Sequence, residues 1–229
     1  MEQILLYLKD FYYTNAILII STVILVYISI KKRNNIKHCK FLFLYPLVSL
    51  IQQAIIFYSI FRNSPDYIKR SELNNLSINI FIIIELLIVF FLFIKILRNK
   101  LNKLILLILQ VGYVLYYIYY FTTGDMRNPV DQSISIAQCF VIIIPCLFYF
   151  IELFNRPATL NLINEPNFWL ASGLLINFSF MLPGYILIDK IVYDKFYYVQ
   201  STYSLIYISY SILFLLFTKA YTCNSIITQ

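Results

Sequence analysis

The stretch Asn79-Ile-Phe-Ile-Ile-Ile-Glu85-Leu-Leu-Ile-Val-Phe-Phe-Leu-Phe-Ile94 is apolar after its first residue except for one carboxylic acid, Glu85. Together with its flanking residues it is long enough to cross the hydrocarbon core of a bilayer, which is about 30 Å thick. A carboxylate at mid-membrane depth costs about 2.5–3.5 kcal/mol on insertion scales unless it is protonated, paired or hydrated. The sequence therefore indicates a membrane protein with one interior position whose surroundings need explanation.

The composition of the whole chain supports this interpretation. Hydrophobic residues make up 61% of the 229 residues and charged residues 13%, whereas a soluble domain has about 25% charged residues. The apolar residues form long blocks and do not alternate with polar ones, as they would in a lipid-spanning β-strand. We predict an all-α polytopic membrane protein made of one domain, residues 1–229.

Seven blocks have the length of a membrane-spanning helix, roughly 20 residues at a rise of 1.5 Å. The predicted spans are Phe11–Ile30, Phe41–Phe61, Leu76–Leu97, Leu101–Phe121, Ser135–Phe154, Asn167–Ile188 and Tyr197–Thr218. The short link Arg98-Asn99-Lys100 predicts that the third and fourth helices are antiparallel neighbours. Pro46, Pro145 and Pro183 fall inside spans, where a proline frees a backbone carbonyl and kinks the helix.

Basic residues predict the orientation of these spans. The first and third connections, around Lys31–Lys40 and Lys95–Lys103, are rich in Lys and Arg and contain no acid. With Arg156 and Lys219, this side of the membrane carries 11 of the 18 Lys and Arg residues and two of the 11 acids. Cytoplasmic loops are enriched in Lys and Arg, so we expect the N-terminus outside and the C-terminus in the cytoplasm.

Several polar side chains occupy positions inside the predicted spans, at depths similar to that of Glu85. The candidate ligand-binding or proton site consists of Glu85, Gln52, Gln53, Asn177, Tyr113, Tyr203 and Tyr207. Gln110, Gln138 and Tyr210 lie at positions from which they can also reach the interior. Buried polar groups in lipid must find partners, so these side chains are expected to converge.

Two interpretations of this polar cluster stay open at the level of sequence. In the first, Glu85 is protonated or hydrogen-bonded to Gln52, Gln53, Tyr113 or Asn177 and only ties helices together. In the second, Glu85 lines a pocket and binds a ligand amine, a cation or a proton, because intramembrane carboxylates are functional candidates by default.

Other chemistries lack the residues that they need. His38 is the only histidine and lies in a basic loop, and the four cysteines have no CxxC spacing, which argues against a metal site or a catalytic triad. Lys219 lies at the end of its span, which disfavours a retinal Schiff base. No recognisable catalytic motif is present. We therefore expect no enzyme activity, no cofactor and no nucleic-acid binding.

Two segments carry a resemblance to a known group of proteins. One is the run from Ile80 through Glu85, followed by a basic link, and the other is Glu165-Pro-Asn-Phe-Trp-Leu-Ala-Ser-Gly173, which continues to Pro183. They resemble small uncharacterised bacterial seven-helix integral membrane proteins, which are similar to the seven-helix sensor blocks found in front of some histidine kinases. The resemblance implies a bacterial cytoplasmic membrane location. The chain ends soon after its last span, so we expect any signal to leave through a partner.

The predicted function is a stand-alone sensor or receptor-like membrane protein with a polar interior pocket around Glu85. Its expected partners are the lipid bilayer, a small molecule or lipid entering from the outer face, and a protein partner in the membrane. Two alternatives are a transporter or channel subunit, with Glu85 as the proton or cation site, and a structural subunit of a membrane complex.

Overall fold

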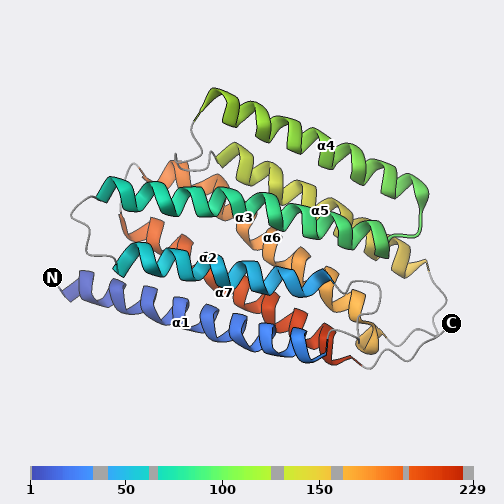
Figure 1. Cartoon of the computed structure of the whole chain (residues 1–229), viewed down its shortest axis with the longest axis horizontal. Coiled ribbons are helices and arrows are strands. Elements are labelled where there is room, and N and C mark those ends of the chain that lie inside the picture. Colours follow the sequence, from blue (N-terminus) through green and yellow to red (C-terminus); the bar gives the residue numbers. More distant parts are fainter. Residues whose placement is uncertain are drawn as a thin grey trace.

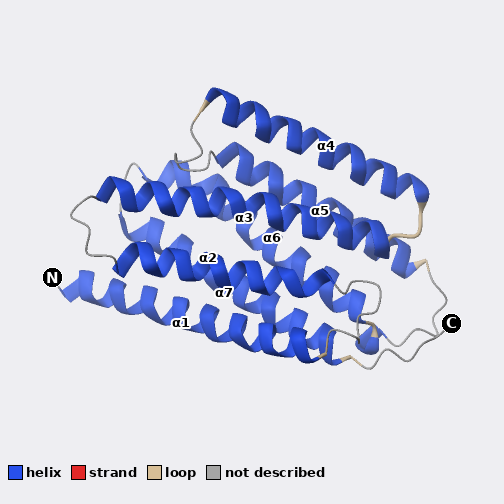
Figure 2. Cartoon of the chain, in the orientation of Figure 1, coloured by secondary structure: helices blue, strands red, loops and turns tan. Residues whose placement is uncertain are grey.

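A computed structural model describes residues 2–32, 41–61, 67–124, 132–155, 162–192 and 196–223. Within these ranges the side chains of residues 2–12, 57, 59–61, 67–71, 188–192 and 196–203 are not described. The described backbone is helical apart from short turns and connections (Figure 2). The helices are α1 (Glu2–Lys31), α2 (Leu44–Phe61), α3 (Tyr67–Ile96), α4 (Lys100–Thr123), α5 (Gln132–Phe154), α6 (Pro166–Val192) and α7 (Phe196–Thr222), with a short 3-10 turn, η2 (Leu162–Asn164), before α6.

All seven predicted helices are present in the described residues, and two of them begin many residues earlier than expected. α1 begins at Glu2 and α3 at Tyr67, nine residues before the predicted starts at Phe11 and Leu76. The prediction counted only the apolar residues. A helix that has formed extends through polar residues at little cost, because each added residue contributes one more hydrogen bond.

Helix length and hydropathy identify the chain as an integral membrane protein. Six helices in the described residues are long and apolar enough to cross a membrane. The remaining helix, α2, belongs to a described apolar stretch, Phe41–Ile56, that is shorter than the other six spans. Helices suit this environment because lipid offers no partner to a backbone N–H or C=O group.

The three prolines do not have equivalent positions. Pro145 and Pro183 lie inside α5 and α6, as predicted. Pro46 lies in the first turn of α2, which begins at Leu44. The N–H groups of the first turn have no partner within the helix, so a proline there costs no hydrogen bond. The expectation that Pro46 breaks the second helix is therefore wrong.

Six of the helices form a closed ring, and α4 lies outside it. The ring follows the contacts of α1 with α2, α2 with α3, α3 with α5, α5 with α6, α6 with α7 and α7 with α1. α4 packs against α3 and α5 and forms the upper edge of the molecule in Figure 1, with α1 at the lower edge. Of the six apolar spans, the one in α3 has the largest buried share and the one in α4 the smallest.

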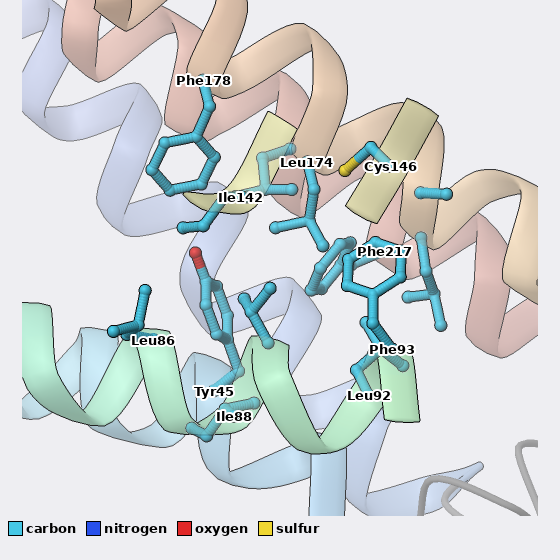
Figure 3. Packing of buried hydrophobic residues seen from close by; sticks show 14 of the residues in the cluster. Tyr45, Leu86, Ile88, Leu92, Phe93, Ile142, Cys146, Leu174, Phe178 and Phe217 are labelled. Atoms are coloured by element: carbon cyan, nitrogen blue, oxygen red, sulfur yellow. The ribbon is translucent and has the colours of Figure 1, made fainter. Parts of the chain in front are cut away.

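The interior of the ring is filled by large side chains. Tyr45, Phe93, Phe178, Phe214 and Phe217 are among the largest fully buried residues. Figure 3 shows several of these residues meeting between the helices. Lipid tails are as apolar as these side chains, so the helices associate through close packing and hydrogen bonds and not through exclusion of water.

The turn between α3 and α4 is held by a carboxylate from a third helix. Glu152 on α5 accepts hydrogen bonds from the backbone N–H of Arg98 at 2.7 Å and of Asn99 at 3.2 Å, and from Asn102 Nδ2 at 2.8 Å. Asn99 also caps α4, its side chain accepting from the Leu101 N–H. The predicted antiparallel arrangement of α3 and α4 is confirmed, and Glu152 fixes it to α5.

We expect Glu152→Ala to destabilise the protein by about 1–3 kcal/mol, because it removes a charged acceptor that serves three donors. Glu152→Gln keeps one oxygen acceptor and should lie between Glu152→Ala and the wild type. Thermal unfolding in detergent measures both variants. A melting temperature of Glu152→Ala equal to that of the wild type would show that the turn does not depend on this carboxylate.

Gly173 permits close packing of α6 on α7, and Gly112 on α4 provides a matched control. A Cβ atom at position 173 would lie 3.0 Å from Leu213 Cδ1 and 3.3 Å from Leu216 Cβ, whereas one at position 112 would meet nothing within 4 Å. We expect Gly173→Ala to lower the melting temperature through overpacking. Gly112→Ala should leave it unchanged or raise it, because alanine favours a helix by about 1 kcal/mol over glycine. The opposite order of the two variants would contradict this packing.

Candidate functional site

Glu85 lies near the middle of its apolar span along the helix axis, and its side chain is buried inside the bundle. It is the fourteenth of the 25 residues in the apolar span Glu72–Ile96. Its side chain is 1% exposed. The helix that carries it, α3, contacts α2, α4 and α5, so the face bearing Glu85 is closed off from lipid.

Two short hydrogen bonds hold the Glu85 carboxyl group. Tyr45 on α2 donates its hydroxyl to Oε1 at 2.5 Å. Gln138 on α5 donates Nε2 to Oε2 at 2.8 Å. Each carboxyl oxygen therefore has its own donor, and the two donors come from helices on different sides of α3.

A third, longer contact comes from α7. The Tyr210 hydroxyl lies 3.4 Å from Glu85 Oε1 and 3.5 Å from Oε2. These distances are at the long end for a hydrogen bond between two oxygens, so Tyr210 adds less than Tyr45 or Gln138. Its position nevertheless brings a fourth helix of the ring to the same carboxyl group.

The ring of Tyr45 is fixed by aromatic neighbours. Its centroid lies 5.4 Å from that of Phe217, 6.2 Å from Phe214 and 6.5 Å from Phe81. Figure 3 shows Tyr45 reaching from its helix into the packed interior, near Leu86. Aromatic pairs at these separations add about 0.5–1.5 kcal/mol beyond the area that they bury. The hydroxyl is thus positioned by packing before it meets Glu85.

No charged group balances Glu85 in the described part of the chain. Its hydrogen-bond partners there are the uncharged side chains Tyr45, Gln138 and Tyr210. The described residues also contain no group of three or more His, Cys, Asp or Glu side chains that could hold a metal ion. Hydrogen bonds to a charged group contribute about 1.5–3 kcal/mol each, which is the scale needed to offset the burial of this carboxylate.

The two principal donors respond differently to a proton on Glu85. A tyrosine hydroxyl both donates and accepts, so Tyr45 can accept from a protonated Oε1 by turning its own hydrogen away. The Nε2 group of Gln138 only donates, so a proton on Oε2 leaves this group with a weaker, uncharged acceptor unless the amide rotates to present its oxygen. Protonation of Glu85 therefore changes the hydrogen bonding of α2 or α5.

Further tyrosines and a cysteine extend the cluster. Tyr113 on α4 and Cys139 on α5 lie within electrostatic range of Glu85. Tyr185 on α6 lies within that range of both Tyr113 and Tyr210. Together with the direct partners, Tyr113 and Cys139 bring polar or ionisable groups of α2, α4, α5 and α7 near Glu85, and Tyr185 on α6 lies near Tyr113 and Tyr210.

The polar residues expected to bond Glu85 mostly have other partners. Gln53 donates to Thr22 Oγ1 at 2.9 Å, which links α2 to α1, and to Ser49 Oγ on α2 itself at 3.3 Å. Asn177 accepts from Ser209 Oγ at 2.8 Å, which links α6 to α7. The predicted hydrogen bonds of Glu85 to these residues are therefore replaced by bonds to Tyr45, Gln138 and Tyr210.

The other predicted site residues differ in how closely they approach this centre. Gln52 is half-buried and is not a hydrogen-bond partner of Glu85. Tyr113 is 5% exposed and belongs to the extended cluster. Tyr207 is half-buried on α7. The side chain of Tyr203 lies outside the described residues.

Tyr45 is the partner that the sequence did not indicate. It is the second residue of α2, a position typical of the interfacial aromatic belt. Its depth alone gives no reason to connect it with a mid-membrane acid. The one available signal is the length of a phenol side chain, which reaches toward the interior from a helix end.

Comparison with known proteins does not place the chain in a family. Searches against protein-family models, curated proteins and solved structures find no match. The resemblance to bacterial seven-helix membrane proteins stays a prediction. The structure and the hydropathy support a helical protein with six to seven long apolar helices and a buried Glu85 that is hydrogen-bonded to tyrosine and glutamine side chains.

Proposed function

We propose that the protein is a sensor-like integral membrane protein in which Glu85 controls how the helices pack. The observation that carries this proposal is the buried carboxyl group whose two oxygens are bonded to Tyr45 and Gln138 on two other helices. A proton, or a bound molecule that competes for these donors, would change the contacts of α3 with one or both of these helices. The proposed role is not enzymatic.

Tyr45 provides the route by which such a change spreads. Its ring packs against Phe214 and Phe217 of α7, and α7 packs in turn against α1 and α6. If the Tyr45 ring is displaced inside this close-packed aromatic group, its neighbours shift as well, because such interiors have few voids. Movement at Glu85 is thereby coupled to the packing of α7 against α1 and α6.

The basic end of the bundle is the proposed output surface. Lys95 at the end of α3 lies over the Phe41 ring at 5.0 Å, and Lys219 at the end of α7 lies over the Trp169 ring at 6.0 Å. The positive-inside rule favours a cytoplasmic location for this end, with the N-terminus outside. In this proposal a protein partner in a bacterial cytoplasmic membrane binds this end and responds to the arrangement of the helices.

The alternative function is proton transport, and one observation favours it. The Tyr45 and Tyr210 hydroxyls both face Glu85, and hydroxyl groups can accept a proton on one side while donating on the other. In that case Glu85 would be a site that a proton occupies during transport. A purely structural role, in which the cluster only ties helices together, is the third possibility.

Glu85→Gln separates these functions, because glutamine keeps the shape of a protonated acid but cannot ionise. Spin labels at the exposed positions Ile51 on α2 and Leu215 on α7, in a variant without native cysteines, report the distance between these helices in lipid discs. We expect the wild-type distance to change on acidification. Glu85→Gln should show the acidic distance at every pH.

A second measurement on the same variants follows proton flux into vesicles under a pH gradient. The sensor proposal predicts flux that does not depend on Glu85. Flux that is lost in Glu85→Gln would establish the transport alternative. Equal distances in the two proteins at all pH values, with no flux, would leave only the structural role.

Tyr45→Phe tests whether the hydroxyl is energetically coupled to Glu85, because it keeps the aromatic ring. We expect Tyr45→Phe to destabilise the protein by about 1–3 kcal/mol, the cost of leaving a buried acceptor without its donor. Its effect should be smaller in the Glu85→Gln background, because a neutral amide oxygen accepts a weaker hydrogen bond from Tyr45 than a carboxylate does. Unfolding in detergent measures both effects.

Tyr117→Phe is the matched control for this double-mutant cycle. Tyr117 is also buried, but its hydroxyl donates to the Asn79 carbonyl oxygen at 2.8 Å. Its effect should therefore be the same in the wild-type and Glu85→Gln backgrounds. If Tyr45→Phe is as additive as Tyr117→Phe, the bond between Tyr45 and Glu85 does not contribute to the folded state.

A further inference from the structure

The inner face of α4 presents polar atoms that lack partners. Its buried residues are Leu106, Gln110, Tyr113 and Tyr117, which form one stripe along the helix. Gln110 and Tyr113 are each 5% exposed. Gln110 Nε2 and the Tyr113 hydroxyl have no hydrogen-bond partner in the described part of the chain.

These two side chains lie next to each other on the same face. Residues three apart on a helix are neighbours, with Cβ atoms about 5–6 Å apart. α4 packs against α3 and α5, so this buried face is directed at the helices that carry Glu85 and Gln138. Tyr117, on the same stripe, has its hydroxyl satisfied by Asn79 on α3. Within this stripe, the buried polar atoms that lack a partner in the described part of the chain are therefore those of Gln110 and Tyr113.

The chemistry of the pair defines its occupant. The Gln110 Nε2 group only donates hydrogen bonds, and the Tyr113 hydroxyl donates and accepts. An occupant must offer an acceptor to Gln110 and either an acceptor or a donor to Tyr113. A buried water molecule does so, and it typically makes about three hydrogen bonds to polar groups that are otherwise unsatisfied.

Glu85 is a suitable further partner for such an occupant. An ionised carboxylate has about four lone-pair positions, and Glu85 has two short hydrogen bonds and one long one. Tyr113 lies within electrostatic range of Glu85. A molecule between α4 and α3 that accepts from Gln110 and Tyr113 can donate its own hydrogens toward the carboxylate.

We propose that Gln110 and Tyr113 form a buried water site between α4 and helices α3 and α5, and that this water hydrates the Glu85 cluster. The site deepens the proposed function and rests on it for its role, because it supplies a mobile hydrogen-bond donor to the group that would control helix packing. The water site would also connect α4, which lies outside the ring, to the Glu85 cluster that controls helix packing.

X-ray radiolytic footprinting tests the site, because hydroxyl radicals made from a bound water oxidise the side chains that touch it. In the full-length protein in lipid discs, we expect Tyr113 to be oxidised several-fold faster than Tyr149, which is 0% exposed. Gln110→Leu, which is of similar size but cannot donate a hydrogen bond, should slow the oxidation of Tyr113. Equal rates at Tyr113 and Tyr149, or no effect of Gln110→Leu, would overturn the proposal.

Thermal unfolding provides an independent readout. If the Tyr113 hydroxyl binds water, Tyr113→Phe lowers the melting temperature. If the interface is dry, removing an unsatisfied hydroxyl leaves the melting temperature unchanged or raises it, which overturns the proposal. Tyr119→Phe is the matched control, because Tyr119 is on the same helix and 66% exposed.

The two proposals fail in different ways. Oxidation of Tyr113 together with an unresponsive Glu85→Gln variant would keep the water site and remove the sensor function. A Glu85-dependent change in helix distance with no oxidation of Tyr113 would keep the sensor function and remove the water site.

Discussion

The hydrogen bonding of the Glu85 carboxyl group is the constraint on which the rest of the bundle depends. Lipid offers no hydrogen-bond partner, so a carboxyl group at mid-membrane depth must obtain its partners from other helices. Tyr45 and Gln138 supply them from α2 and α5. Because each donor meets a different oxygen, the position of α3 relative to both helices is fixed by a single side chain.

Other polar contacts inside the bundle join helices in pairs. Gln53 joins α2 to α1, Ser209 joins α7 to α6, and Tyr117 joins α4 to α3. Interhelical hydrogen bonds of this kind contribute on average about 0.6 kcal/mol, so each is a modest local tie. Glu85 differs because it connects several helices in the middle of the ring, where a change in one bond affects the others.

The sequence predicts the helices because, in the described part of the chain, six of the apolar runs are long enough to match the thickness of a bilayer. Depth within the membrane also follows from position along a helix, which is why Glu85 was correctly identified as central. Rotation about the helix axis and the order of helices around the ring do not follow from depth. Gln53 and Asn177 lie at suitable depths but meet nearer hydroxyl partners, Thr22 and Ser209, on adjacent helices. Likewise, no pattern in the sequence places α4 outside the ring.

We propose that protonation of Glu85 changes the hydrogen bonding of Tyr45 at the same time. Infrared difference spectroscopy with isotope-labelled tyrosine follows both groups during a pH titration, with Glu85→Gln and Tyr45→Phe identifying the bands. We expect the Glu85 carboxyl band and the Tyr45 ring band to change in the same pH step, and the Tyr45 change to disappear in Glu85→Gln. A Glu85 band that titrates while the Tyr45 band stays constant would contradict it.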